Sequence, residues 1–240
     1  MATGYKMDHA LLMSRAKTIR ELKPNYWWDA DHGITLDSDR VASWVDRVAG
    51  LELAQADDAK QPTWAKYGLS QRSCLIFDGR DVLFNATCPM AAWTKHTVLV
   101  QYQMLGVVPD PAASQAFLAA SQASDPVDSY LFFGVSSLNV QMTLFRNDAA
   151  AVFARGATDV NTTAGRRVGC FTQNAALDKW VQYLDGVSEV LGPGTDAGKS
   201  FSGVTGMDVF SVGAQSADGV GLGTPLYGKI AQIIMWDELL

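Results

Sequence analysis

The sequence predicts an all-β protein, an antiparallel β-sandwich, and three observations indicate this fold class. Residues 138–144 alternate apolar and polar side chains, as a half-buried strand does. Residues 179–187 (KWVQYLDGV) alternate and end in Asp185-Gly186, a strong signal for a two-residue hairpin turn. Residues 230–236 are apolar except for Gln232, which predicts a strand covered on both faces. With 21 Gly and 7 Trp, these patterns favour many strands joined by many turns over a helical bundle.

Other short runs of apolar residues between turn signals predict further strands. They are Tyr26–Ala30, Val41–Asp46, Cys74–Leu83, Thr97–Leu105, Ala151–Ala154, Val168–Phe171 and Val209–Gly213.

One segment departs from this pattern and predicts a short helix in a loop. It is Pro109–Ser124 (PDPAASQAFLAASQAS), in which Asp110 is placed to cap a helix and Pro111 to occupy its first position. The AASQ repeat gives it low complexity. Such an insertion covers an open end of the sandwich, contacts a neighbouring subunit, or lies passively on the surface.

The N-terminal residues predict an amphipathic helix over 8–22, with apolar residues on one face at Leu12, Ala16, Ile19 and Leu22. Residues 1–24 hold five basic and two acidic side chains, a net charge of +3, so the other 216 residues carry −9 of the total −6. We therefore expect an N-terminal helical arm, 1–24, and one β-domain, 25–240. The arm docks on its own body or on a partner chain, or it closes one end of the sandwich.

Bulk composition excludes several functional classes. A net charge of −6 and a pI near 5.0 argue against nucleic-acid binding. No run of 18 apolar residues is present to span a membrane, and the first residues lack the apolar core of a secretory signal. Three cysteines, Cys74, Cys88 and Cys170, show no metal or redox spacing. We expect them to be buried free thiols in a chain that folds in a reducing cytosol.

The order of the motifs resembles the laminin-G-like, concanavalin A-like family of jelly-roll domains. At the end of the chain, the strand with Asp185-Gly186, the VFSVG of residues 209–213 and the GKIAQIIMWDELL of residues 228–240 stand in that family's order. Near its start, Trp27-Trp28-Asp29, VASWVD, Gln61-Pro62-Thr63 and CLIFDGRDVL resemble the family's versions in phage and bacterial proteins. The resemblance covers about residues 25–240. It implies a jelly roll that is mostly a binding scaffold and only sometimes a glycoside hydrolase.

The resemblance does not extend to the family's catalytic residues, so we expect no enzyme. The hydrolases carry E-x-D-x-x-E along one strand, but the only glutamates here are Glu21, Glu52, Glu189 and Glu238, with no two within four residues. Aspartate pairs occur at Asp57-Asp58 and Asp29/Asp31, in turn-like contexts where Asp commonly bonds the backbone. The three histidines, His9, His32 and His96, are isolated, and the glycines of 219–223 lack the setting of a phosphate loop.

Calcium and sugar sites remain open possibilities. Loop aspartates suited to calcium are Asp29, Asp31, Asp196 and Asp218. The segment from Asp29 resembles an EF-hand loop but has Arg40 where the closing Glu belongs, so we assign no metal ligand and no cofactor.

A sugar platform would need exposed aromatic rings, and the most aromatic cluster is Tyr26-Trp27-Trp28, between Asn25 and Asp29. Because adjacent strand residues face opposite sides, Trp27 and Trp28 cannot both enter one core. One of them must meet the arm, a partner or a ligand. The sugar-binding residues are therefore unknown at this point.

The functional prediction is a non-catalytic structural or recognition protein, a bacteriophage virion component such as a capsid decoration, turret-like or tail-fibre protein. It rests on the resemblance, the absent signal and the arm, which suits docking on an assembly. Expected partners are other virion proteins, its own copies in a homo-oligomer and surface glycans, with no nucleic acid and no membrane. The alternative is a free carbohydrate-binding lectin module, assisted by calcium, and a glycoside hydrolase is the disfavoured third.

Overall fold

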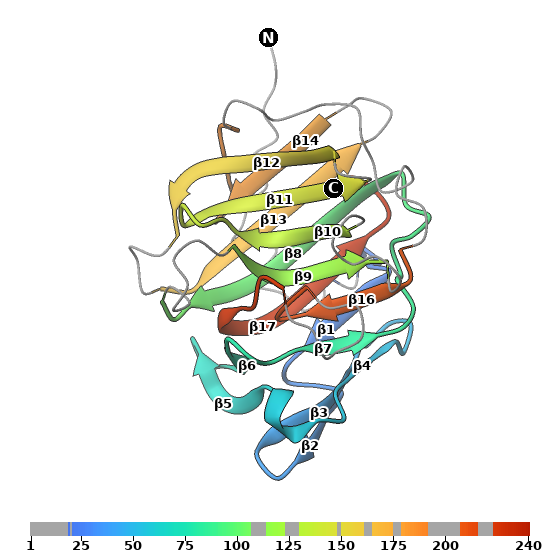
Figure 1. Cartoon of the computed structure of the whole chain (residues 1–240), viewed down its shortest axis with the longest axis vertical. Helices are drawn as coiled ribbons and strands as arrows, with labels where there is room; N and C mark the ends of the chain where they lie inside the picture. Colours follow the sequence, from blue (N-terminus) through green and yellow to red (C-terminus); the bar gives the residue numbers. More distant parts are fainter. Residues whose placement is uncertain are drawn as a thin grey trace.

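The computed structural model describes residues 19, 21–106, 114–122, 130–147, 150–160, 165–174, 179–191, 207–215 and 223–240. Over these residues the chain forms seventeen strands and one short 3-10 helix, and every strand pair is antiparallel. The strands lie in two stacked layers (Figure 1). The predicted fold class, an all-β antiparallel sandwich, is confirmed. Among the described residues, no helix is long and apolar enough to span a membrane.

One layer, the back layer in Figure 1, is built around the long strands β8 and β17. In hydrogen-bonding order its strands are β15 (Val187–Ser188), β14 (Lys179–Leu184), β13 (Arg167–Asn174), β8 (Lys95–Met104) and β17 (Tyr227–Trp236). The far edge of β17 is shared by β6 (Arg72–Asp78) along its first half and β1 (Tyr26–Asp29) along its second.

The front layer runs from β12 to β4. Its strands are β12 (Ala150–Asp159), β11 (Val140–Asn147), β10 (Tyr130–Val135), β9 (Gln115–Ser121), β16 (Val209–Val212), β7 (Leu83–Asn85) and β4 (Glu52–Ala54).

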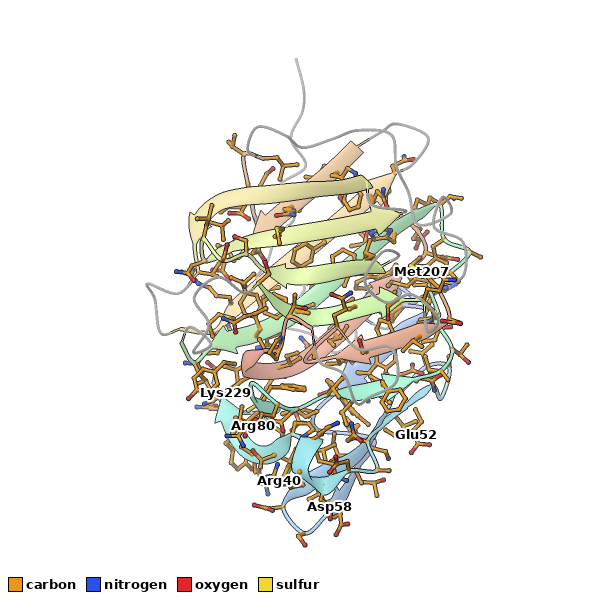
Figure 2. All side chains as sticks on the ribbon, in the orientation of Figure 1. Arg40, Glu52, Asp58, Arg80, Met207 and Lys229 are labelled. Carbon is orange, nitrogen blue, oxygen red and sulfur yellow. The ribbon has the colours of Figure 1, made fainter. Side chains whose placement is uncertain are left out.

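The two layers join at one narrow end of the molecule. The elements there are β2 (Ile34–Asp37), β3 (Arg40–Val45), β5 (Thr63–Leu69) and the 3-10 helix η1 (Asp58–Lys60). Strand β3 pairs with β2, with β4 of the front layer and with β5, which in turn pairs with β6 of the back layer. The charged side chains of Arg40, Asp58 and Arg80 lie at this end (Figure 2).

The last strand is covered on both faces, as predicted. Ile233 and Met235 enter the main core between the layers, and Ile234 and Trp236 enter a second cluster on the outer face of the back layer. Apolar burial of this kind contributes about 1.5–3 kcal/mol for each large side chain, so β17 is a principal source of stability.

The predicted helix at 109–124 is wrong over its described part. Gln115–Ser121 is strand β9, which pairs with β10 on one side and β16 on the other, and every one of its residues is buried. The small residues Ala116, Ala119 and Ala120 favour a helix in isolation, but a central sheet position and burial on both faces override that weak local preference. Residues 109–113 and 123–124 lie outside the described residues.

The alternating run at 138–144 belongs to strand β11 from Val140 onward, but the strand is not half-buried as predicted, because residues 140–143 are all buried. Thr143 and Gln141 pair with Phe133 and Val135 of β10, so their polar side chains face the interior between the layers. There the Gln182 amide donates to the Thr143 hydroxyl from the opposite layer, at 3.2 Å. Polar residues are tolerated on this inner face because they have partners across the sandwich.

Most of the predicted arm lies outside the described residues. At its described end, Ile19 and Leu22 pack on the outer face of the back layer against Trp27 and Trp236. That contact agrees with the alternative in which the arm closes one end of the sandwich. The division of the chain into an arm, 1–24, and a β-domain, 25–240, stays a prediction.

Candidate ligand-binding site

The β14–β15 hairpin forms a rigid wall at one end of the back layer. Its turn residues Asp185 and Gly186 both have positive φ, 51° and 81°, which is the type I′ geometry that the Asp-Gly pair predicts. The Asp185 carboxylate accepts from the backbone N–H of Val168 at 2.9 Å and from the Arg167 guanidinium at 2.6 Å. The hairpin is therefore fixed to the neighbouring strand β13 by a charged hydrogen bond.

A second carboxylate, that of Glu189, lies just after β15 and joins the two layers. One of its oxygens accepts from the side-chain amide of Gln141 on β11, at 2.9 Å, and the other accepts from the backbone N–H of Thr158 on β12, at 3.2 Å. The same Gln141 amide also donates to the carbonyl oxygen of Tyr183, at 3.2 Å. Two strands of the front layer thus hold the carboxylate of Glu189, which itself follows the back-layer strand β15.

These groups border a cleft of about 280 Å³, which we call the hairpin cleft. Its lining residues are Thr158, Arg167, Leu184, Asp185, Val187, Ser188 and Glu189. The lining contains a guanidinium and hydroxyls that donate, and carboxylates that accept, beside an apolar rim at Val187, which is 70% exposed. A site with both donors and acceptors in fixed positions suits a ligand rich in hydroxyl groups.

Two residues that neighbour the cleft residues carry buried polar atoms without a hydrogen-bond partner among the described residues. They are Tyr102, which pairs with Arg167 in the sheet and has an unpaired hydroxyl, and Gln141, which bonds Glu189 and has an unpaired side-chain oxygen. Burial raises the pKa of Tyr102 well above its usual value, and the charge of Asp185 adds to the effect, so its phenol stays protonated. Gly169 provides the room for Gln141, because a Cβ at this position would collide with the Gln141 Oε1 atom.

The aromatic cluster predicted for sugar binding is divided between two cores. Trp28 is buried between the layers, stacked with Tyr26 and Phe210, while Trp27 is buried on the outer face with the end of the arm. The prediction that they point to opposite sides is confirmed, but neither ring is an exposed platform, at 0% and 3% exposure.

The two described aspartates among those considered for calcium, Asp29 and Asp31, bond to groups of the protein itself. Asp29 accepts from the Arg47 guanidinium at 2.8 Å and from the backbone N–H of Asp31, and Asp31 accepts from the backbone N–H of Ser73. Among the described residues, no group of three or more His, Cys, Asp or Glu side chains is placed to hold a metal ion. Asp196 and Asp218 lie outside the described residues.

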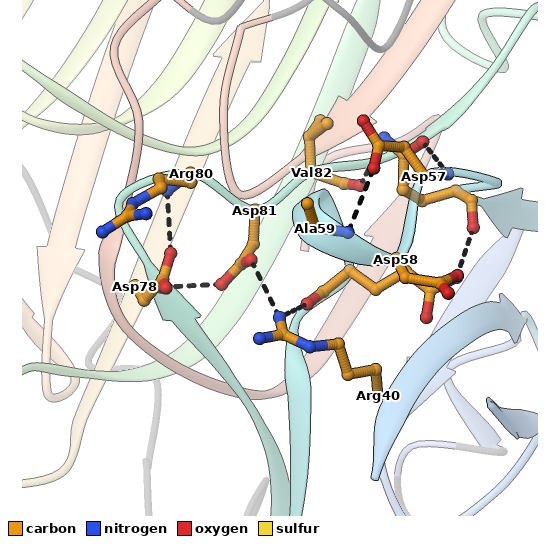
Figure 3. A network of polar contacts seen from close by, with 10 residues as sticks. Arg40, Asp57, Asp58, Ala59, Asp78, Arg80, Asp81 and Val82 are labelled. Carbon is orange, nitrogen blue, oxygen red and sulfur yellow. Dashed lines mark hydrogen bonds and ion pairs between the residues drawn. The ribbon is translucent and has the colours of Figure 1, made fainter. Parts of the chain in front are cut away.

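The Asp57-Asp58 pair also bonds locally, as its turn-like context predicts. Asp57 caps η1 by accepting from the Ala59 N–H at 3.0 Å, and the Asp58 carboxylate accepts from the Gln61 amide at 3.4 Å (Figure 3). Nearby, Arg40 joins this corner to the buried Asp81, with 3.8 Å between charged atoms. The network ties η1 to the β6–β7 turn.

The remaining candidates form no reactive group in the described chain. His96 is fully buried and His32 is exposed, while His9 and glycines 219–222 lie outside the described residues. All three cysteines are buried free thiols, as predicted, and burial raises their pKa values to about 11 for Cys74 and Cys88 and about 12 for Cys170. Of the glutamates, only Glu189 lines the hairpin cleft.

Sequence patterns do not reveal the hairpin cleft. Nothing in the local sequence singles out Arg167, the pattern around Asp185 indicates only a turn, and Glu189 is one of too few glutamates for a catalytic pair. The single local signal is the Asp-Gly turn itself, because the groups that meet at the cleft come from β11, β12, β13 and the β14–β15 hairpin.

Comparisons with known proteins bear on the fold of this chain. No protein-family model matches the sequence, and no curated protein matches it either. Domain 4 of AbnA, a GH43 extracellular arabinanase from Geobacillus stearothermophilus in complex with arabinotriose, aligns with a TM-score of 0.59 and 8% identity over 91% of this chain and 94% of that one. The CBM40 of the Ruminococcus gnavus IT-sialidase, bound to α2,3-sialyllactose, aligns with a TM-score of 0.53 and 14% identity over 63% and 80%.

A third similar structure is the K499G mutant of the NanB sialidase from Streptococcus pneumoniae, with a TM-score of 0.53 and 12% identity over 70% of this chain. The match spans only 26% of that sialidase. At these identities the likeness shows the fold, an antiparallel β-sandwich of lectin-like type. It agrees with the predicted jelly roll, and none of the three bears on a phage context.

Proposed function

We propose that the protein is a non-catalytic carbohydrate-binding module and that the hairpin cleft is its glycan site. The observation that carries the proposal is the fixed pairing of donors and acceptors around Arg167, Asp185 and Glu189 at one end of a β-sandwich. Sugar hydroxyls donate and accept at once, so such a lining satisfies them better than a lining of one kind. The similar structures support the proposal, since two of them hold sialyllactose and arabinotriose.

A binding role agrees with the hydrogen bonds that the two cleft carboxylates, Asp185 and Glu189, already make to the protein. Asp185 is bonded to a guanidinium and a backbone N–H, and Glu189 to an amide and a backbone N–H. Both oxygens of each carboxylate thus accept a hydrogen bond from the protein, whereas the acid of a glycosidase must be directed at the glycosidic oxygen of its substrate. We therefore propose recognition of the glycan without its hydrolysis.

The test is a glycan array followed by calorimetry on the strongest glycan, with sialyllactose and arabinotriose included. Val187→Trp fills the cleft from its exposed rim without touching the core, and we expect it to abolish binding. Val190→Trp is the matched control, because Val190 is 81% exposed and does not line the cleft. If Val187→Trp leaves glycan binding unchanged, the glycan site lies outside the hairpin cleft. If no glycan on the array binds, the proposal of a carbohydrate-binding module is refuted.

Two further experiments test the role of the Asp185 charge and the need for calcium. Asp185→Asn keeps a residue that tolerates positive φ and removes the charge, so we expect weaker glycan binding by a folded protein. A chelator added to the wild type tests the calcium-assisted lectin, which loses binding when the metal is removed.

The virion component remains a second candidate that rests on the sequence resemblance. The observation relevant to it is that Ile19 and Leu22 pack on the chain's own body, which leaves residues 1–18 as the segment to test for assembly. The test is the solution mass of the full-length protein beside a version without residues 1–18. If the full-length protein is a closed oligomer and the truncated version a monomer, the result supports the virion role with its partners and location. If both versions are monomers, the result counts against the homo-oligomer.

A further inference from the structure

A second cavity lies beside Trp27, on the other side of the back layer from the main core. It is bordered by the loop that follows β3, and Asp46 shapes this loop. One Asp46 oxygen accepts from the N–H groups of Val48 and Ala49, and the other accepts from Leu51 at 2.7 Å. The loop is also bonded to β1, because the Arg47 N–H donates to the Trp27 carbonyl oxygen at 2.9 Å.

The Arg47 side chain is fixed across the Trp27 ring. Its guanidinium carbon lies 4.4 Å from the ring centroid, and its Nη1 atom donates to the buried Asp29 carboxylate at 2.8 Å. A cation held between an aromatic face and a carboxylate loses little freedom on binding a ligand. The cavity is therefore built before any ligand arrives.

The cavity has a volume of about 440 Å³, which suits a small organic molecule. Its described lining residues are Lys23, Pro24, Trp27, Arg47 and Val48. Each polar side chain among them, the ammonium, the indole and the guanidinium, is a hydrogen-bond donor and none is an acceptor.

One of these donors has spare capacity in the described part of the chain, because Lys23 is exposed and forms no ion pair there. The Trp27 indole nitrogen is itself buried, so the ring contributes its surface to the cavity and its N–H is a neighbouring group. A ligand that only accepts hydrogen bonds and carries negative charge would pair with Lys23. Val48 and Pro24 supply an apolar surface beside it.

We propose that this cavity binds the carboxylate of a small organic acid or acidic sugar. The carboxylate pairs with Lys23 and with Arg47, whose guanidinium has N–H groups besides the one on Asp29, and the carbon skeleton lies against Val48. The inference is independent of the proposed glycan function, because Trp27 and the hairpin cleft are on different strands, with β17, β8 and β13 between β1 and β14.

The test adds sodium glucuronate, sodium acetate or glucose to the protein and monitors the indole N–H resonance of Trp27 by NMR. The resonance is assigned by its loss in Trp27→Phe. We expect glucuronate to shift this resonance and glucose to leave it unchanged. A shift by acetate as well identifies any small carboxylate as the ligand, and a shift by glucuronate alone identifies an acidic sugar. Salt should weaken the binding, since the lysine is exposed.

Lys23→Gln removes one charge-assisted bond and should weaken glucuronate about tenfold. Lys66→Gln is the matched control, an exposed lysine with the same change of charge outside the cavity. The proposal is overturned if no carboxylate shifts the Trp27 resonance, if glucose shifts it as glucuronate does, or if the two lysine variants weaken binding equally. Loss of glycan binding at the hairpin cleft would leave this result untouched.

Discussion

The Trp236 indole N–H donates to the carbonyl oxygen of Leu22 at 2.9 Å, so the last strand is bonded directly to the end of the N-terminal segment. The two residues are 214 positions apart in the chain. Around this bond, Ile19, Trp27, Leu99, Val168 and Ile234 form the apolar cluster on the outer face of the back layer. A β-sandwich has two outer faces to protect from water, and here the first residues cover part of one.

Ile19→Ala should lower the free energy of unfolding by about 2–4 kcal/mol, because Ile19 is 4% exposed and the substitution leaves a cavity against Trp27 and Trp236. Urea unfolding monitored by tryptophan fluorescence measures the change. The matched control is Val190→Ala at an 81% exposed position, where we expect a change within about 0.5 kcal/mol. Equal stabilities of the two variants would show that Ile19 does not pack on the body.

Asp81 should make the protein less stable as pH rises from about 4 to 7. Burial raises the pKa of this carboxyl to about 7 from 3.8, although its bond from the Asp78 N–H and the nearby Arg40 oppose the rise. The folded state therefore holds a proton that the unfolded chain releases near pH 4, and the associated stability is lost between these values. Relative to the wild type, Asp81→Asn should therefore gain roughly 2–4 kcal/mol of stability at pH 7 compared with pH 4, measured by urea unfolding at several pH values.

Asp57→Asn is the control for that experiment, since the Asp57 side chain is 53% exposed and caps η1 from the surface. It should leave the pH dependence as it is. A pH dependence of Asp81→Asn identical to that of the wild type would assign the titration to another group.

His96 should act in the opposite direction. It is fully buried against Phe133 and Trp180, and burial lowers its pKa from 6.5 to about 3. As pH falls, the His96 side chain binds a proton near pH 6.5 in the unfolded chain but only near pH 3 in the folded protein. Stability is therefore lost as pH falls from 6.5 toward 3. His96→Gln should reduce the difference in stability between pH 7 and pH 4.5 by about 2–3 kcal/mol.

The two titrations overlap, so the wild-type profile should be flatter than that of either single variant. Combining Asp81→Asn with His96→Gln tests their independence, because the two pH slopes should add if the sites do not interact. A double variant with the same steep profile as one single variant would contradict the assignment of the group whose substitution was added second.

Gly169→Ala should lower stability by about 1–3 kcal/mol, since the new Cβ would collide with Gln141 Oε1 and would lie 3.2 Å from Phe171. Gly165→Ala is its control, because a Cβ there meets nothing within 4 Å. Adding Gln141→Ala to Gly169→Ala removes the clashing oxygen and should recover part of the loss, measured as a double-mutant cycle. A cycle without coupling would mean that Gly169 is not required to make room for Gln141.

The sequence alone predicted the features that depend on neighbouring residues. Side chains in a strand alternate between faces, so the alternation at Trp180–Leu184, the Asp185-Gly186 turn and the apolar run of β17 are visible as local patterns. The opposite directions of Trp27 and Trp28 follow from the same geometry. The fold class and most strands can therefore be predicted from local patterns.

Only the tertiary structure decided what those strands meet. Gln115–Ser121 contains helix-forming alanines, but it is a strand because it lies between β10 and β16. Its position in an alternating run predicts that Gln141 is exposed, but its amide donates to Tyr183 and Glu189 of the opposite layer. Arg167, Asp185, Glu189 and Thr158 meet in one cleft because β12 of one layer approaches β14 of the other. Periodicity determines which face a side chain takes, but the partner of that face is set by contacts between residues far apart in the chain, and no local pattern contains them.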